Sequence, residues 1–336
     1  MKKKPIVISM GEPSGISSEI LIKTWINRKK KNLLPFFVVD DKSKIEFVIN
    51  LFKFDAKVKL IKNPNETFDI FNNYLPVYDL GNKIKFKLGQ PEKKNSKFII
   101  DSLNKSFNFV KNKQASALVT LPICKRTMKQ FGFNYNGQTE YVGFLARKLI
   151  NRSSNEIMIL TTTKPIDSGK NLVIGLATTH IPLKKVHQNI SKRKIVNHVE
   201  KIHKFYKKNL KKIPHIGLTG LNPHCESYSN TNEEDKIIKP AINFLLKKNY
   251  KISGPFSADT IFLKKNLKKF DVIIGMYHDQ VLTPMKTLFE YDAINITLGL
   301  PFTRISPDHG PNEKMLGKNK SDPKSLIQAI NFLDKN

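Results

Sequence analysis

Apolar positions follow two different periods along the chain, and short, almost wholly apolar runs alternate with longer amphipathic stretches. Short apolar runs that are bounded by Gly, Pro, Asn or Asp are typical of buried β-strands. We expect strands at residues 5–9, 36–40, 117–120, 157–161, 172–177, 215–219, 271–275 and 293–297.

The longer stretches place apolar residues three or four positions apart, which is the spacing of one face of an α-helix. Ile195, Val199 and Ile202 show this spacing, and Tyr206 continues it. We expect helices at residues 16–27, 96–112, 139–149, 191–207, 233–248 and 323–333.

Strands that alternate with helices of this length predict an α/β protein with a largely parallel sheet. The chain of 336 residues is long enough for two domains. Polar, turn-rich sequence near residues 130–155 predicts a passage to a second domain, and we expect the chain to return near residues 265–280. The expected first α/β/α domain therefore comprises residues 1–135 plus 275–336, and the second comprises residues 136–274.

The chain carries 58 lysine and arginine residues against 28 acidic ones, a formal net charge of +30. A basic nucleic-acid-binding protein is one interpretation of this charge and stays the alternative of another class. Only six of the basic residues are arginine, the residue best suited to phosphate and base recognition, and the lysines are spread along the chain. We therefore interpret the charge as dispersed, solvated lysine that helps to attract an anionic substrate, and expect no nucleic-acid partner.

The sequence gives no support to several other classes of protein. No apolar run reaches the roughly 18 residues of a membrane-spanning helix. The apolar run that follows the N-terminal lysines is interrupted by Gly11 too early for a signal peptide. Two cysteines, Cys124 and Cys225, make no disulfide framework, and no Gly-x-Ser-x-Gly motif indicates a serine hydrolase. We expect a cytoplasmic protein without a membrane partner.

Three histidines each stand just beyond the carboxyl end of an expected strand, namely His180, His224 and His278. In open α/β sheets this edge is where ligands bind. Three imidazoles suit a borderline divalent ion and leave coordination positions open for a substrate. Three unrelated loop histidines are the alternative, because no short His-x-x-His motif joins them.

Two further features are compatible with anion binding. Arg304 stands out because arginine is rare in this chain, and a guanidinium can hold a carboxylate or phosphate with two hydrogen bonds. An ordinary surface arginine is the alternative. The loop 11–15 follows a strand and opens a helix, but it lacks both the P-loop ending and the three-glycine dinucleotide fingerprint. We interpret that loop as a tight structural turn.

Taken together, an ordered set of short motifs resembles the 4-hydroxythreonine-4-phosphate dehydrogenase family of vitamin B6 biosynthesis. The resemblance runs from about residue 5 to the C-terminus, and the order of the motifs makes it specific. The motifs are Gly11-Glu12-Pro13-Ser14-Gly15-Ile16, Thr120-Leu121-Pro122-Ile123-Cys124-Lys125, Gly137-Gln138-Thr139-Glu140, Ala177-Thr178-Thr179-His180-Ile181-Pro182-Leu183, Gly220-Leu221-Asn222-Pro223-His224, Gly254-Pro255-Phe256-Ser257-Ala258-Asp259-Thr260, Met276-Tyr277-His278-Asp279-Gln280 and Thr297-Leu298-Gly299-Leu300-Pro301-Phe302.

This resemblance implies the fold of the isocitrate and isopropylmalate dehydrogenases, with two α/β/α domains and the active site in the interdomain cleft. It also implies a homodimer, with dimer contacts in the second domain and each site drawing residues from both subunits. The implied cofactors are NAD or NADP and a divalent metal, zinc first, with magnesium or cobalt as alternatives.

The resemblance also implies roles for individual residues. The implied metal ligands are His180, His224 and His278, and the implied substrate-binding residues are Gln138, Thr139, Lys286, Asn295 and Arg304. Residues 303–318, with His309 and Gly310, resemble the dinucleotide-binding loop. Gln138 stands where the family usually has histidine, and its amide can donate a hydrogen bond to a phosphate or hydroxyl but cannot carry a proton charge.

The implied reaction is oxidation of 4-hydroxythreonine 4-phosphate, followed by decarboxylation to 3-amino-2-oxopropyl phosphate. Asp279 and Lys286 are the candidate catalytic residues, because either could serve as the general base. A sister dehydrogenase acting on phosphorylated threonate, phosphorylated erythronate or a dihydrodiol acid is the nearest alternative. A metal-dependent hydrolase that uses the same histidines without a nucleotide is another.

Overall fold

The computed structural model describes residues 4–81, 83–150, 156–166, 169–225, 232–290, 292–310 and 318–334. The chain folds into two compact units, the first of residues Met1–Glu156 and Leu300–Asn336 and the second of residues Ile157–Gly299. Both junctions between the units fall later in the chain than the sequence-based domain boundaries, which stay a prediction.

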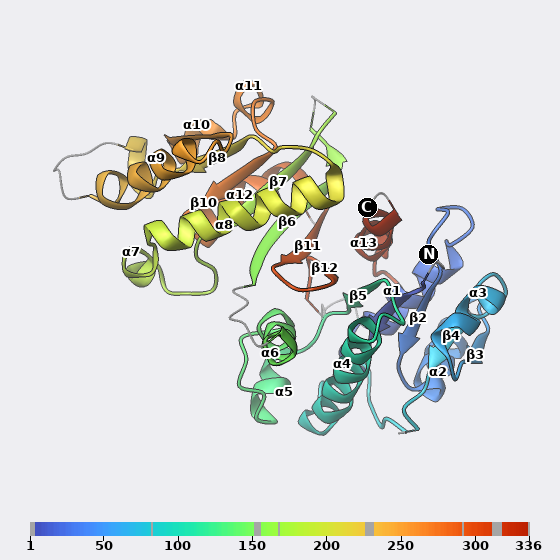
Figure 1. Cartoon of the computed structure of the whole chain (residues 1–336). Helices are drawn as coiled ribbons and strands as arrows, with labels where there is room; N and C mark the ends of the chain where they lie inside the picture. Colours follow the sequence, from blue (N-terminus) through green and yellow to red (C-terminus); the bar gives the residue numbers. More distant parts are fainter. Residues whose placement is uncertain are drawn as a thin grey trace. The chain divides into compact units, whose positions relative to one another are not determined.

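The first unit contains a parallel sheet with the strand order β3-β4-β2-β1-β5-β12 (Figure 1). Its central strands β1, β2 and β5 are buried at every residue, as expected where both faces of a parallel sheet are covered. The strands are β1 (Ile6–Ser9), β2 (Phe36–Val39), β3 (Val58–Leu60), β4 (Leu75–Tyr78), β5 (Ala117–Thr120) and β12 (Thr303–Pro307).

Successive residues of these strands pack against different helix layers, because side chains alternate between the two faces of a sheet. Ile6 and Ile8 join one core with residues of α1, α2 and α13, whereas Val7 joins another with residues of α4 and α6. The helices of this unit are α1 (Ser17–Ile26), α2 (Lys42–Phe52), α3 (Thr67–Ile70), α4 (Ser96–Lys111), α5 (Lys125–Gln130), α6 (Gln138–Ile150) and α13 (Lys324–Asp334).

The second unit contains a mixed sheet with the order β11-β6-β7-β10-β8-β9. The strands β7, β10, β8 and β9 pair in parallel, whereas β6 runs antiparallel to both β7 and β11. The connection between β6 and β7 is too short for a crossover, so these strands form an antiparallel pair. The strands are β6 (Ile157–Pro165), β7 (Asn171–Leu176), β8 (Ile216–Thr219), β9 (Ile252–Phe256), β10 (Val272–Gly275) and β11 (Ala293–Leu298).

Helices cover both faces of this second sheet. Val281 and Met285 of α12 share a core with Ile174 of β7, whereas Ile202 of α8 packs on Gly175, where an added Cβ would lie 3.5 Å from Ile202 Cδ1. The helices are α7 (Val186–Asn189), α8 (Lys192–Phe205), α9 (Lys239–Lys247), α10 (Ala258–Ile261), α11 (Lys264–Leu267) and α12 (His278–Phe289).

Every strand and helix expected from the sequence is present, with ends that differ by a few residues. The apolar face of α8 is confirmed, because Ile195, Val199 and Ile202 are fully buried. Several elements were not expected, among them helices α2, α5 and α12 and strands β3, β4, β9 and β12. Pro284 lies inside α12 and Pro255 inside β9, and proline argues against both kinds of element in a sequence.

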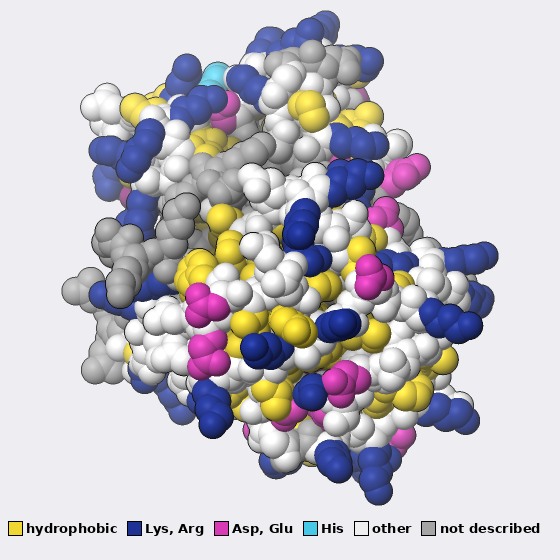
Figure 2. All heavy atoms as spheres, turned by 90° about the vertical axis from the view of Figure 1, so that its right-hand side faces the viewer, with side chains coloured by type: hydrophobic (Ala, Val, Ile, Leu, Met, Phe, Trp, Pro, Cys, Tyr) yellow, Lys and Arg dark blue, Asp and Glu magenta, His cyan; other side chains and the backbone are white. Residues whose placement is uncertain are grey.

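The surface supports the interpretation of the charge as dispersed. On the face shown in Figure 2, lysine and arginine side chains are scattered among acidic and apolar ones rather than gathered in a single block. Within the described part of the chain, no helix combines the length and apolarity that crossing a membrane requires.

Candidate active site

The three histidines follow neighbouring parallel strands of the second unit. Strands β7, β10 and β8 lie side by side in that order. His180 follows β7, and His224 lies in η5 (Pro223–Cys225), a short 3-10 helix after β8. His278 is the first residue of α12, after β10. All three therefore leave the carboxyl edge of the sheet, where ligands bind in open α/β proteins.

Gln280 braces the backbone at this edge. It is buried, its Nε2 donates to the carbonyl of Gly220 at 2.7 Å, and its Oε1 accepts from Thr219 Oγ1 at 2.7 Å and from the Met276 amide at 2.8 Å. The Thr178 hydroxyl also donates to the Met276 carbonyl at 2.7 Å. These bonds tie the ends of β7, β8 and β10 together, at about 0.5–1.5 kcal/mol of net stabilisation each.

Glu234 fixes the loop that carries His224. Its buried carboxylate accepts from the Leu221 amide at 2.7 Å and from the Asn222 amide at 2.8 Å, and Asn222 Nδ2 donates to it at 2.9 Å. Burial acts to raise the pKa of Glu234, but these hydrogen bonds outweigh it and the pKa is lowered. The carboxylate therefore stays ionised and holds the loop.

The backbone at His224 is held in an uncommon conformation. His224 and Cys225 have φ values of 56° and 57°, in the left-handed region that costs a non-glycine residue about 1–3 kcal/mol. A Cβ on Gly220 would lie 2.6 Å from Cys225 Sγ, so a larger residue there would displace the Cys225 side chain. Such strain gathers at functional sites.

Two of the three histidines lie close together. The ring centroids of His180 and His278 are 5.4 Å apart, and His278 Nδ1 is hydrogen-bonded to Asp279 Oδ1 at 2.6 Å. His224 is not gathered with this pair: among the residues that the structure describes, no group of three His, Cys, Asp or Glu side chains is placed to hold a metal ion. The metal triad therefore stays a prediction.

His224 instead has an acidic neighbour on α10. The Ser257 hydroxyl donates to the Asp259 carboxylate, and this bond, together with the charge of His224, lowers the pKa of Asp259. No role for Asp259 was predicted from the sequence. The available signal was its place in the Gly254–Thr260 motif.

Three other histidines of the second unit, His187, His198 and His215, are exposed or have structural partners. His198 is buried in α8, where its Nδ1 bonds the Lys194 carbonyl at 2.8 Å, and burial lowers its pKa to about 4. His215 bonds Ser253 Oγ at 2.9 Å, and His187 is exposed.

Arg304 of the first unit is buried rather than on the surface, which excludes the ordinary surface arginine. It is 2% exposed, its Nη1 donates to Thr139 Oγ1 at 2.7 Å, and its Nη2 donates to Thr120 Oγ1 at 2.6 Å. Burial lowers its pKa to about 10, and the charge of Glu140 acts in the opposite direction. The guanidinium remains a cation at neutral pH and fixes Thr139, the second residue of α6.

Gln138, the first residue of α6, is buried beside Arg304's partners. Its Nε2 donates to the Leu121 carbonyl at 2.8 Å, and its Oε1 has no partner within the described part of the chain. Because Nε2 donates to a backbone carbonyl, the side-chain atom of Gln138 that remains available is Oε1, which can only accept a hydrogen bond. The expectation that Gln138 donates to a phosphate therefore does not fit this geometry.

The other expected site residues lie in different elements. Lys286 is half-buried on α12, and Asn295 of β11 donates to Met158 Sδ at 2.8 Å. His309 Nδ1 is hydrogen-bonded to the Gly310 carbonyl at 3.0 Å just after β12. Seven of the sixteen residues of the expected dinucleotide-binding loop, 311–317, lie outside the described residues.

The loop 11–15 is a tight turn, as expected. A Cβ on Gly11 would lie 2.2 Å from Ser17 Oγ and 2.5 Å from the Pro122 carbonyl, so only glycine fits. The Glu12 amide donates to the Pro122 carbonyl at 2.8 Å, and the Ser14 amide donates to Glu12 Oε1 at 3.2 Å. The amides of Glu12 and Ser14 therefore donate to groups of the protein, and an anion at this loop would have to compete for them.

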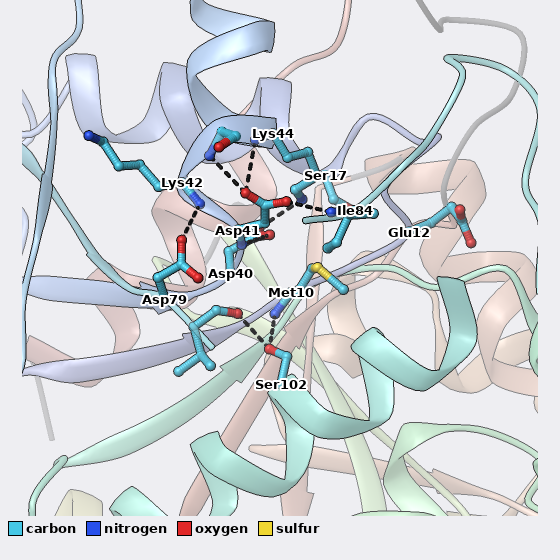
Figure 3. A network of polar contacts seen from close by, with 12 residues as sticks. Met10, Glu12, Ser17, Asp40, Asp41, Lys42, Lys44, Asp79, Ile84 and Ser102 are labelled. Carbon is cyan, nitrogen blue, oxygen red and sulfur yellow. Dashed lines mark hydrogen bonds and ion pairs between the residues drawn. The ribbon is translucent and has the colours of Figure 1, made fainter. Parts of the chain in front are cut away.

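A buried polar network adjoins this turn (Figure 3). Lys44 and Asp40 form an ion pair of 2.8 Å whose two side chains are 0% and 1% exposed. Asp41 caps α2 and accepts from the Ile84 amide at 2.6 Å, and Ser102 Oγ accepts from the amide of Met10 at 2.8 Å. These polar groups bind one another and hold the edge of the first sheet.

By its fold the chain belongs to the class of two-unit α/β proteins. An isocitrate dehydrogenase from Methylococcus capsulatus shares the fold, with a TM-score of 0.50 and 10% identity over 98% of this chain and 84% of its own. A putative 4-hydroxythreonine-4-phosphate dehydrogenase from Salmonella typhimurium has a TM-score of 0.82 at 26% identity, over 99% of both chains.

Sequence comparison identifies the family. The model of the family described as "Pyridoxal phosphate biosynthetic protein PdxA" matches residues 32–333, and the chain belongs to this family. The 4-hydroxythreonine-4-phosphate dehydrogenase of Zymomonas mobilis is 36% identical over 97% of this chain and 94% of its own length. The resemblance found in the motifs and the predicted fold class are confirmed.

Proposed function

We propose that this protein oxidises 4-hydroxythreonine 4-phosphate with NAD or NADP at a metal centre, followed by decarboxylation to 3-amino-2-oxopropyl phosphate. The observation that carries the proposal is the match, over 97% of the chain, to a relative named for this dehydrogenase. The exposed histidines and the buried Arg304 at strand ends are compatible with a small, anionic, metal-binding substrate.

The residues present fit a divalent metal. Two imidazoles on one zinc ion, with Zn–N distances of about 2.0–2.1 Å and tetrahedral angles, have ring centres roughly 5 Å apart. The 5.4 Å between His180 and His278 supports this arrangement, and the Asp279 carboxylate orients His278 as carboxylates orient metal-bound histidines. These residues would hold a divalent ion, which would supply Lewis-acid chemistry at the oxygen of the substrate hydroxyl.

We also propose a homodimer in which each site draws residues from both subunits. Support comes from the three histidines, which form no set of three metal ligands among the described residues of a single chain. A third imidazole from the other subunit would complete the set that a borderline ion prefers.

The other site residues orient the substrate. Lys286, Asn295 and Thr139 contact its polar groups, Gln138 accepts a hydrogen bond from it, and Arg304 adds positive charge and fixes Thr139. Asp279 and Lys286 remain the candidate general bases. His309 and Gly310 are proposed to contact the dinucleotide, which would supply the hydride acceptor.

The test is reduced-nucleotide formation from 4-hydroxythreonine 4-phosphate with NAD and with NADP, before and after removal of metal by a chelator. We expect chelator-sensitive turnover that zinc, magnesium or cobalt restores. Turnover of phosphorylated threonate or erythronate alone would move the assignment to a sister dehydrogenase. Phosphate release without any nucleotide would replace it with a hydrolase.

A further inference from the structure

Lys125 lies beside the N-terminus of α6, and none of the roles assigned above involves it. A Cβ placed on Gly137, the residue just before α6, would lie 3.7 Å from Lys125 Cε and 3.9 Å from Lys125 Nζ. Lys125 is exposed at the start of α5, whereas Arg304 at the same helix end is 2% exposed. An ammonium group that solvent reaches therefore stands at the N-terminus of a 13-residue helix.

The N-terminus of a helix attracts anions, because its first amides have no intrahelical acceptor and the helix dipole is positive there. An independent observation at the same end indicates a ligand. Gln138 is only 9% exposed, its nitrogen is bound to Leu121, and its Oε1 has no partner among the described residues. A buried acceptor without a partner costs about 1–3 kcal/mol, which a ligand hydroxyl or ammonium group would recover.

The local charges favour an anion next to that donor. Lys125 and Arg304 each contribute a positive charge, and Glu140 is the acidic side chain at the same end, with its Oε2 3.3 Å from a Cβ placed on Gly137. The sum of these three charges and the helix dipole is positive. A lysine ammonium binds phosphate well as a point charge.

We propose that Lys125 is an additional substrate-binding residue, which holds the phosphate group of the substrate at the N-terminus of α6 while Gln138 accepts a hydrogen bond from a neighbouring hydroxyl or ammonium group. This inference rests on the proposed function for the identity of the substrate. Lys125 and Gln138 by themselves indicate only the chemistry of the ligand, which is a phosphate group with a hydrogen-bond donor close to it.

The first experiment compares Lys125→Gln with Lys129→Gln, which makes the same charge change one turn further along α5 at another exposed lysine. Lys125→Gln should raise KM for 4-hydroxythreonine 4-phosphate about tenfold, or about 1.4 kcal/mol, and leave kcat within about twofold. Lys125→Arg should restore most of the loss. With unphosphorylated 4-hydroxythreonine, Lys125→Gln and the unchanged protein should differ by less than about twofold.

Titration with inorganic phosphate separates this inference from the proposed function, because it requires no turnover. Phosphate should bind about tenfold more weakly to Lys125→Gln than to Lys129→Gln, and more tightly to Glu140→Gln than to the unchanged protein. If phosphate binding follows Lys125 but no dehydrogenase activity exists, the inference holds and the proposed function fails. Equal effects of Lys125→Gln and Lys129→Gln on KM and on phosphate binding would overturn the inference.

Discussion

The two units differ in the ionisable groups at their sheet edges. In the second unit, His180 and His224 are exposed, and the amide of Gln280 and the buried carboxylate of Glu234 brace the backbone beneath them. In the first unit, the ions themselves are buried, as the Lys44–Asp40 pair and Arg304 show.

The exposed histidines are suited to binding, whereas the buried ions stabilise the fold. An exposed imidazole on a braced backbone can exchange protons or take a metal without disturbing the core. A buried ion is costly to leave unpaired, so it fixes its neighbours and changes little with the solvent. Substitutions of the exposed histidines should therefore change activity first, and those of the buried Lys44–Asp40 pair should change stability first.

The largest expected effect is loss of turnover in His278→Ala. A metal centre contributes several kcal/mol to the transition state, so turnover should fall by at least about 10²- to 10³-fold, with loss of bound metal. Because the side chain is partly exposed, the melting temperature of the metal-free protein should stay close to that of the metal-free parent. Activity and metal content per subunit are the measurements.

His187→Ala is the matched control, since it removes an exposed histidine from the same unit. It should keep both metal and activity. Full metal content in His278→Ala would exclude His278 as a ligand and remove the contrast between the two edges.

Breaking the buried ion pair should give the next largest effect. Lys44→Met leaves Asp40 buried without its cation and should lower the free energy of unfolding by about 3–5 kcal/mol, as measured by denaturant unfolding. Lys42→Met on the same helix breaks only an exposed pair with Glu46 and should cost less than about 1 kcal/mol.

The pH dependence of Lys44→Met follows from the burial of Asp40. Burial raises the pKa of Asp40 above its ordinary 3.8, with Lys44 acting in the opposite direction, so the variant should raise that pKa further. A folded-state pKa above the unfolded value means that the folded protein keeps the proton longer, and stability falls as pH rises through that window. The penalty should be smallest near pH 4 and grow toward neutral pH; a constant penalty would contradict this account.

The sequence predicted most of the central sheet strands and the strand-end histidines because both depend on local patterns. Buried strands such as β1 and β5 are short apolar runs, and residues after parallel strands meet at one edge by topology alone. The sequence did not predict α12 or β12, which are specified by packing against the sheet and not by their own pattern.

Side-chain polarity at the site also depended on the fold. The sequence shows that Gln138 is present but does not show that its Nε2 donates to the Leu121 carbonyl. That hydrogen bond leaves Oε1, an acceptor, without a partner among the described residues. Likewise, no apolar pattern specifies the left-handed turn at His224 and Cys225, which sets the backbone conformation at the third histidine.

The contrast between buried and exposed ionisable groups can also be tested on histidines alone, because His198 is buried and His180 is exposed. Its pKa of about 4 lies below the ordinary 6.5, so between these values the unfolded chain binds a proton that the folded protein does not. Stability should fall by about 3 kcal/mol as pH drops from 6.5 to 4. His198→Gln should flatten this slope, and His187→Gln should leave it unchanged, as followed by unfolding at several pH values.

Gln280→Leu should give the smallest effect. It tests whether the hydrogen bonds of Gln280 hold the strand-end histidines in position. The change removes a hydrogen-bond partner from Thr219, Gly220 and Met276, all at the strand ends behind the histidines. Loss of support behind metal ligands typically weakens metal binding by about 10- to 100-fold, so metal affinity should fall by that factor. Thr287→Ala, at an exposed position of the same helix, should leave affinity unchanged. Unaltered affinity in Gln280→Leu would mean that the histidines hold their positions without this support.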